Sequence, residues 1–243
     1  MAATVMITGA SRGIGLEFAR AYGASGWQVI AAARNPDTAN ELRTLAKQQG
    51  NITIEKLDVT DPADIKRLST AYQDASIDLL INNAGIQGPP PDRQALGSLD
   101  PGSFGDVIMT NTFAPLVVAE AFRRQVGASK QKKIIAISSG GGSLGGGMAV
   151  GGMYAYRASK TALNLVFKAL RADLEADGII VAVITPGFVD TDMYKSVTKD
   201  SPTHGAEANT PAVSVEGMIK AIDGMTLKNC AQFFRYDGTT MPW

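Results

Sequence analysis

Near the start of the chain, residues 3–15 read ATVMITGASRGIG, a short apolar run followed by three glycines. The apolar run predicts a buried strand, and a helical pattern begins at about residue 13, directly after the glycine-rich turn. Glycines at such a turn let backbone N–H groups approach a pyrophosphate, whose charge the helix N-terminus stabilises. We therefore predict a dinucleotide-binding loop, formed by Gly9, Ser11, Arg12, Gly13, Ile14 and Gly15.

The spacing of this loop is Gly-x-x-x-Gly-x-Gly, which differs from the commoner Gly-x-Gly-x-x-Gly fingerprint. A glycine-rich turn that binds no ligand is the alternative interpretation. The position of the loop, between the first predicted strand and the first predicted helix, favours the cofactor site.

Strand and helix patterns alternate along the whole chain. Continuous apolar runs such as residues 79–81 and 134–137 are typical of parallel strands that are buried on both faces. The pattern predicts a single doubly wound (Rossmann-type) α/β domain over residues 1–243, with a mainly parallel sheet and helices on both faces. Strands are expected at 3–8, 27–33, 52–57, 77–82, 132–138, 178–185 and 231–235, and helices near 13–25, 37–48, 62–75, 103–127, 155–176 and 212–223. A long connection at about 188–211 is expected to be a substrate lid.

The composition excludes several classes of protein. The 243 residues carry 23 Lys and Arg against 23 Asp and Glu, and this zero net charge argues against a nucleic-acid partner. Hydrophobic residues make up 45%, which excludes intrinsic disorder, and no apolar run approaches the roughly 20 residues of a membrane helix. The single cysteine, Cys230, cannot form an internal disulfide, so a cytoplasmic location is expected. The only histidine, His204, cannot build a metal cluster, and no metal site is expected.

Two arginines indicate which dinucleotide binds. Arg12 lies inside the glycine-rich loop, and Arg34 directly follows the second predicted strand, near the expected adenosine ribose. Guanidinium groups suit a 2′-phosphate, whereas an acidic residue at the end of this strand would favour the free hydroxyl of NAD. The strand ends without an acid; Asp37 lies close enough to leave NAD open, but is better explained as a helix cap. NADP(H) is therefore the expected cofactor.

Two further strand ends carry groups for the same cofactor. Asp58 and Val59 follow the third predicted strand, where an aspartate can reach the adenine amino group. Asn83, Ala84 and Gly85 follow the fourth. Asn83 also has a purely structural interpretation, because side-chain amides hold turns at strand ends, and we expect both roles.

A tyrosine and a lysine one helical turn apart form the candidate catalytic pair. Tyr156 and Lys160 stand at i and i+4 at the start of a strong helical pattern, so both can point into one cleft. An ammonium group near a phenol stabilises the phenolate and lowers the pKa of the tyrosine. Alone, such a pair is equally typical of a solvated helix face. Its place after a predicted strand that ends in Ser138 and Ser139 favours catalysis.

Asn111 is singled out by a proline four residues later. Pro115 has no N–H to donate to the carbonyl of Asn111, so that carbonyl is predicted to be free and the helix kinked. A free carbonyl beside an active site can hold a water that connects Lys160 to solvent as a proton relay. A proline that merely bends the helix explains the same sequence equally well.

These residues together resemble the short-chain dehydrogenase/reductase family, and the match covers essentially the whole chain. The residues that carry it are 8–15, 82–85, Asn111, Ser139, Tyr156, Lys160, Pro186 and Gly187. Residues 152–157 and 237–243 resemble the subgroup of Sniffer carbonyl reductase and C-factor.

The resemblance implies hydride transfer at a carbonyl or alcohol carbon. It implies that Tyr156 protonates the carbonyl oxygen, that Lys160 lowers the pKa of Tyr156 and holds the nicotinamide ribose, and that Ser139 orients the substrate oxygen. Asn111 would maintain the relay. The residues expected to flank the nicotinamide are Pro186, Gly187, Val189 and Thr191.

The expected activity is NADPH-dependent reduction of a small aldehyde or ketone. A homo-oligomer, a dimer or tetramer, is expected to pair through the helices near 103–127 and 155–176. One alternative is an NADP-binding sensing or signalling protein of the C-factor type, with little physiological catalysis. Another is an NAD-dependent alcohol dehydrogenase, against which Arg12 and Arg34 argue.

One departure concerns the serine. Ser139 precedes Tyr156 by 17 residues, whereas in much of the family the separation is about a dozen, so the glycine-rich stretch between them resembles an insertion. Ser143 has the usual spacing and is the second candidate. Ser139 is preferred because it directly ends a strand, where a side chain is rigidly held.

Overall fold

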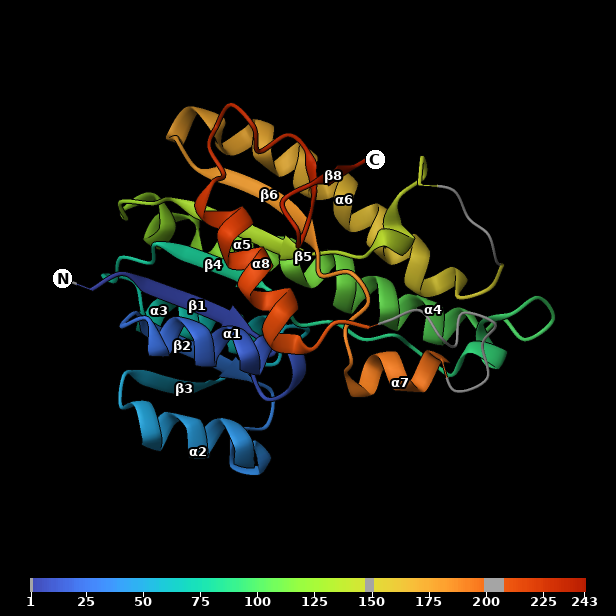
Figure 1. Ribbon diagram of the computed structural model, residues 1–243, viewed down its shortest axis with the longest axis horizontal. Helices are drawn as coiled ribbons and strands as arrows, with labels where there is room; N and C mark the ends of the chain where they lie inside the picture. The colour runs from blue at the N-terminus through green and yellow to red at the C-terminus, as the bar shows by residue number, and fades with distance from the viewer. Residues whose placement is uncertain (1, 147–150, 199–207) are drawn as a thin grey trace.

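A mainly parallel sheet forms the centre of the molecule (Figure 1), whose computed structural model describes residues 2–146, 151–198 and 208–243. Within these residues the sheet has eight strands in the order β3-β2-β1-β4-β5-β6-β7-β8, and only β7 and β8 pair antiparallel. The strands are β1 Thr4–Thr8, β2 Gln28–Ala33, β3 Ile52–Lys56, β4 Leu79–Asn82, β5 Lys133–Ile137, β6 Ile180–Thr185, β7 Phe233–Arg235 and β8 Thr240–Met241. The doubly wound fold predicted from the sequence is confirmed.

Helices cover both faces of the sheet (Figure 1). One apolar cluster includes Phe18 of α1 and Met218 of α8, and the other includes Phe122 of α5 and Phe167 of α6, all fully buried. Burial of such side chains from water on both sides is the main stabilisation of a parallel sheet. The helices are α1 Gly13–Ala24, α2 Asn40–Gln49, α3 Pro62–Ala71, α4 Pro101–Ile108, α5 Ala114–Gly127, α6 Tyr154–Leu174, α7 Asp192–Thr198 and α8 Pro211–Asp223. None of the described helices is long and apolar enough to cross a membrane.

Three features differ from the elements expected from the sequence. The helix expected near 103–127 is interrupted by a π-helical segment, η3, at Met109–Phe113. The expected lid contains the short helix α7, and β8 adds a two-residue strand, too short to leave a periodic pattern. The part of the expected lid at 199–207, with His204, lies outside the described residues.

The order of the strands places the candidate site. β1 pairs with β2 on one side and with β4 on the other, so the order of the strands reverses at β1. In sheets of this type a crevice forms at such a reversal, beyond the carboxyl ends of the strands. The glycine-rich loop, residues 83–85, Ser139 and Pro186 follow β1, β4, β5 and β6 respectively, and therefore meet at this edge.

Candidate active site

The glycine-rich loop leaves the N-terminus of α1 open to an anion. Arg12 is the N-cap of this helix, its side chain makes no capping hydrogen bond, and the first turn contains no acidic residue. Gly9 and Gly13 have φ of 67° and 57°, which side chains disfavour. A Cβ on Gly15 would collide with the carbonyl of Gly9. Ser11 and Ile14 lie in the same turn, so the loop has the bare helix end and close packing that a pyrophosphate site needs.

Asn83 has the structural role that its position suggested. Its side-chain Nδ2 donates to the carbonyls of Thr8 and Gly9 at 3.0 and 3.1 Å, and its backbone N–H donates to the hydroxyl of Thr8 at 3.0 Å. The N–H of Ala84 donates to the same hydroxyl at 3.0 Å. The loops after β1 and β4 are thus joined, and the cofactor contact of Asn83 stays a prediction.

The two predicted 2′-phosphate ligands lie in different surroundings. Arg34 is exposed directly after β2, as expected. Arg12 forms an ion pair with Asp192, the first residue of α7, at 3.2 Å, and both side chains are about three-quarters exposed. No local sequence pattern predicts this partner, which is 180 positions away. The carboxylate of Asp192 contacts one nitrogen of the guanidinium that is predicted to bind the 2′-phosphate.

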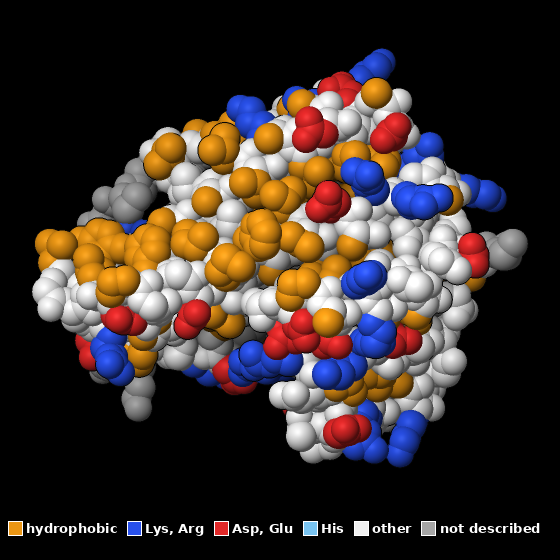
Figure 2. Space-filling model, turned by 180° about the vertical axis from the view of Figure 1, so that it is seen from behind, with side chains coloured by type: hydrophobic (Ala, Val, Ile, Leu, Met, Phe, Trp, Pro, Cys, Tyr) orange, Lys and Arg blue, Asp and Glu red, His pale blue; other side chains and the backbone are white. Residues whose placement is uncertain are grey.

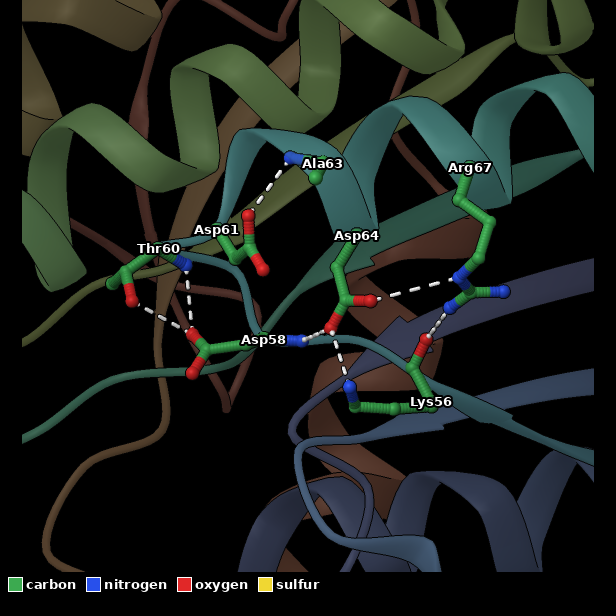
Figure 3. Close-up of polar contacts among 7 residues, drawn as sticks. All are labelled: Lys56, Asp58, Thr60, Asp61, Ala63, Asp64 and Arg67. Carbon is green, nitrogen blue, oxygen red and sulfur yellow. Dashed lines mark hydrogen bonds and ion pairs between the residues drawn. The ribbon is translucent and has the colours of Figure 1, made fainter.

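Asp58 is held in a polar cluster at the end of β3 (Figure 3). Its Oδ1 accepts hydrogen bonds from the backbone N–H and the hydroxyl of Thr60 at 2.9 and 2.7 Å. Its own N–H donates to the carboxylate of Asp64 at 3.0 Å, which also pairs with Lys56 and Arg67 at 3.6 and 3.5 Å. These contacts, led by the hydrogen bond from Asp58, lower the pKa of Asp64. The cluster fixes Asp58, and with it Val59, where adenine contact is predicted.

Tyr156 and Lys160 lie in the first two turns of α6 and face the end of β5. The hydroxyl of Ser139 lies close enough to the phenol of Tyr156 to lower its pKa, and the Nζ atom of Lys160 lies 6.0 Å from the centre of the Tyr156 ring. Lys160 is buried and donates from Nζ to the carbonyl of Ile137 at 2.9 Å. The structure therefore brings the predicted serine, tyrosine and lysine together.

The electrostatics of the pair differ from the sequence-based expectation. Burial raises the pKa of Tyr156, and the hydrogen bond with Ser139 offsets this rise only in part. Burial also lowers the pKa of Lys160 to about 8. Desolvation is the largest influence on the pKa of the Tyr156 phenol and raises it. From the sequence alone, the nearby ammonium of Lys160 is expected to lower this pKa.

Asn111 lies at the centre of the π-helical segment and is fully buried. The N–H of Ala114 donates to the carbonyl of Met109, five residues earlier, so the helix is π-helical just before Pro115, while the kink and the free carbonyl of Asn111 stay predictions. The side chain of Asn111 accepts from the N–H of Ile86 at 2.8 Å and donates to the carbonyl of Ile86 at 2.7 Å. It also donates to the hydroxyl of Ser159, beside Lys160, at 3.0 Å. The water relay stays a prediction.

Ser143 points away from the tyrosine. Its hydroxyl donates to the carbonyl of Pro242 at 2.6 Å, and the N–H of Gly145 donates to the main-chain oxygen of Trp243 at 2.8 Å. The ring of Trp243 stacks on Phe233 with 5.6 Å between centroids. The geometry thus favours Ser139 over Ser143 as the serine that meets the substrate.

The loop after β6 carries the residues that are predicted to flank the nicotinamide. Gly187 has φ of 75°, and a Cβ there would lie 2.8 Å from the ring of Tyr236. Pro186 accepts from the hydroxyl of Ser214 at 2.8 Å, and Val189 forms an isolated bridge with Asn209. A Cβ on Gly13 would lie 3.5 Å from the Thr191 side chain, so this loop reaches the glycine-rich loop.

An open groove of about 670 Å³ extends from this crevice between α4 and α7. Several of its polar residues were not predicted as site residues, because they lie in irregular segments and on short helices with no motif around them. The groove is lined by Arg12, Gly85, Ile86, Gln87, Gly88, Pro89, Ser103, Asp106, Val107, Asp192, Met193 and Ser196.

Comparison with known proteins agrees with this geometry, which defines a dinucleotide-binding α/β protein with a serine–tyrosine–lysine site. The family model for short chain dehydrogenase matches residues 3–202. NADPH-bound carbonyl reductase from chicken fatty liver has a TM-score of 0.89 at 32% identity, covering 100% of this chain and 99% of that one. Carbonyl reductase Sniffer of D. melanogaster has a TM-score of 0.85 at 29% identity, with both chains covered completely. C-signal of Myxococcus xanthus is 35% identical over 168 residues, 69% of this chain and 93% of its own length.

The chain belongs to the short-chain dehydrogenase family, as its sequence indicated. The likeness to Sniffer and to C-signal also agrees with the subgroup that residues 152–157 and 237–243 suggested.

Replacing Asp64 tests the cluster that holds Asp58. Asp64→Ala is expected to lower the free energy of unfolding at pH 7 by about 1–2 kcal/mol, because the partly buried N–H of Asp58 loses its acceptor. Asp64→Asn, which keeps an acceptor oxygen, should lose less. Folding lowers the pKa of Asp64 from its usual value of 3.8, so the ionised carboxylate stabilises the folded protein at neutral pH. This stabilisation is lost as the pH falls below 3.8 and through the lowered pKa of the folded state. Urea unfolding at pH 7 and at acidic pH measures this; an Asp64→Ala effect that is equally large in acid contradicts it.

Replacing Asp192 tests whether its carboxylate competes for Arg12. Asp192→Asn is expected to tighten NADPH binding about two- to fivefold, because an exposed ion pair contributes up to about 1 kcal/mol, and to change NADH binding less. Asp190→Asn is the matched control, since Asp190 pairs with Lys195 at 3.1 Å and not with Arg12. Titration of each variant with both cofactors measures the effect. Equal changes for NADPH and NADH, or for the two variants, would show that Asp192 does not compete for Arg12.

Proposed function

We propose that this chain is a cytoplasmic NADPH-dependent reductase of small aldehydes or ketones, in which Tyr156 donates the proton. The observation that carries the proposal is the position of Lys160, whose buried Nζ atom bonds the carbonyl of Ile137 at the end of β5 and lies 6.0 Å from the centre of the Tyr156 ring, with Ser139 two residues beyond Ile137. The cytoplasmic location rests on the sequence, whose single cysteine, Cys230, cannot form an internal disulfide.

The choice of cofactor rests on the open end of α1 and on two arginines. The bare N-terminus of α1 suits the pyrophosphate, and Arg34 and Arg12 suit the 2′-phosphate, provided that Arg12 leaves Asp192. The similar reductase from chicken fatty liver is described as NADPH bound. NADP(H), rather than NAD(H), is therefore the proposed cofactor, held also by Asp58, Asn83 and the loop after β6.

When bound, NADPH supplies the hydride, and the protein supplies position and a proton. Ser139 lies close enough to Tyr156 to influence its pKa, and both hydroxyls are expected to bond the carbonyl oxygen of a substrate. Because burial raises the pKa of Tyr156, its phenol stays protonated at neutral pH and can give its proton to that oxygen. Lys160 places a buried cation next to the phenol, where it opposes the cost of the phenolate that is left.

A second candidate function is sensing or signalling through bound NADP. It is favoured by the likeness to C-signal, which covers 69% of this chain. A fold and a cofactor site do not fix what a protein does. The two functions are distinguished by turnover: a signalling protein would bind NADPH tightly and reduce no carbonyl compound.

The surface supports the expected self-association. Large apolar side chains are exposed on the π-helical segment and on α6, namely Met109, Phe113 and Leu165, at 46%, 50% and 68%. Figure 2 shows hydrophobic side chains gathered in a band across the face opposite to that of Figure 1. Such a band is typical of a protein interface, and we propose a homo-oligomer that pairs through the helical segments at 103–127 and through α6.

Tyr156→Phe tests the proton donor. The change removes only the hydroxyl, so we expect turnover of a carbonyl panel to fall by about 10²–10⁴-fold while the Kd for NADPH stays nearly constant. NADPH oxidation and a binding titration measure the two quantities. If the variant reduces carbonyl compounds at the wild-type rate, another group is the acid.

Ser139→Ala and Ser143→Ala decide between the two serines. Ser139→Ala is expected to lower kcat by about 10²-fold, because a hydrogen bond to the substrate oxygen is lost. Ser143→Ala is expected to cost about 1 kcal/mol of stability, with a smaller change in kcat, because its hydroxyl bonds Pro242. Steady-state kinetics and thermal unfolding of both variants measure this. A large loss of kcat in Ser143→Ala alone would reverse the assignment.

A further inference from the structure

Gln94 is a buried polar residue that no part of the proposed chemistry uses. It ends the short helix η2, Pro91–Gln94, in the connection between β4 and α4, and its side chain is 2% exposed. Burying a side-chain amide costs free energy unless its polar atoms form hydrogen bonds. Both ends of this amide have partners, and they belong to different parts of the candidate site.

One end reaches the helix that carries Tyr156. Tyr156 is the third residue of α6, so its backbone N–H has no acceptor within the helix. The N-cap residue, Met153, has a left-handed φ of 53° and makes no side-chain capping bond. The Oε1 atom of Gln94 accepts from the N–H of Tyr156 at 3.4 Å, across 62 positions of sequence. Gln94 therefore takes the place of the missing cap.

The other end holds the wall of the groove. The Nε2 atom of Gln94 donates to the carbonyls of Gln87 and Pro89 at 3.1 and 2.6 Å, and both residues line the groove. The side-chain Oε1 of Gln87 accepts in turn from the hydroxyl of Ser196 on α7 at 2.9 Å. One amide thus joins the groove wall, and through it α7, to the first turn of α6.

We propose that Gln94 is a positioning residue that couples the substrate groove to Tyr156. A substrate that packs against residues 87–89 presses on the carbonyls that Gln94 binds, and the same amide fixes the backbone of Tyr156. The orientation of the proton donor and the fit of the substrate then depend on one side chain. This inference rests on the proposed reductase function.

Two substitutions separate the two ends of the amide. Gln94→Met keeps the size and removes both kinds of hydrogen bond; we expect kcat to fall about tenfold, KM to rise several-fold and the Kd for NADPH to stay constant. Gln94→Glu keeps the acceptor for the N–H of Tyr156 but lacks the donors for residues 87 and 89. It is expected to restore much of kcat and to leave KM raised.

Hydrogen exchange of the Tyr156 amide gives a readout that does not depend on activity. Gln94→Met should speed this exchange about tenfold, and Gln94→Glu should return it toward the wild-type rate. The matched control is Gln125→Met, because Gln125 is also buried but donates to the carbonyl of Ser69, away from the site. It should change stability alone.

The outcomes separate the two proposals. If Gln94→Met behaves like Gln125→Met, with kcat and the Tyr156 amide unchanged, the positioning role is overturned. If Gln94→Glu fails to slow the exchange that Gln94→Met accelerates, the capping contact is overturned as well. If the wild-type protein reduces no carbonyl compound, the reductase function fails, and the exchange data still decide whether Gln94 holds Tyr156.

Discussion

A hydrogen bond from the Nζ atom of Lys160 to the carbonyl of Ile137 joins the helix that carries the tyrosine to the end of β5. A buried ammonium is costly unless it is bonded, so this contact fixes the position of α6 along β5. Tyr156 lies one turn before Lys160, and Ser139 lies two residues beyond Ile137. The same bond therefore brings phenol and hydroxyl together. Gly142 allows the close approach, since a Cβ there would lie 2.7 Å from the Lys160 backbone.

The features of this molecule that could be predicted are those that depend on short, continuous stretches of sequence. The buried strands were evident because parallel strands covered on both faces are continuously apolar. The glycine-rich loop and the spacing of Tyr156 and Lys160 were evident because each depends on one turn of backbone. The preference for Ser139 over Ser143 followed from its place at a strand end, and the geometry agrees with that reasoning.

The unpredicted parts depend on contacts between distant segments. Asp192 meets Arg12 across 180 positions, and Gln94 meets Tyr156 across 62, so no local pattern announces either contact. The direction of the Tyr156 pKa was missed for a related reason. The ammonium of Lys160 is evident from the sequence, but the burial that raises the pKa of Tyr156 is a property of the folded chain.

The loop that follows Ser139 is hydrogen-bonded to residues that are translated much later. Ser143 and Pro242, which join it to the segment beyond β8, are 99 positions apart. At about 5–20 residues per second, roughly five to twenty seconds of translation separate the two. The glycine-rich loop and Asn83, by contrast, are complete once β4 has emerged. A growing chain can therefore complete the loop that is predicted to hold the pyrophosphate well before it makes the residues that bond the loop of Ser139.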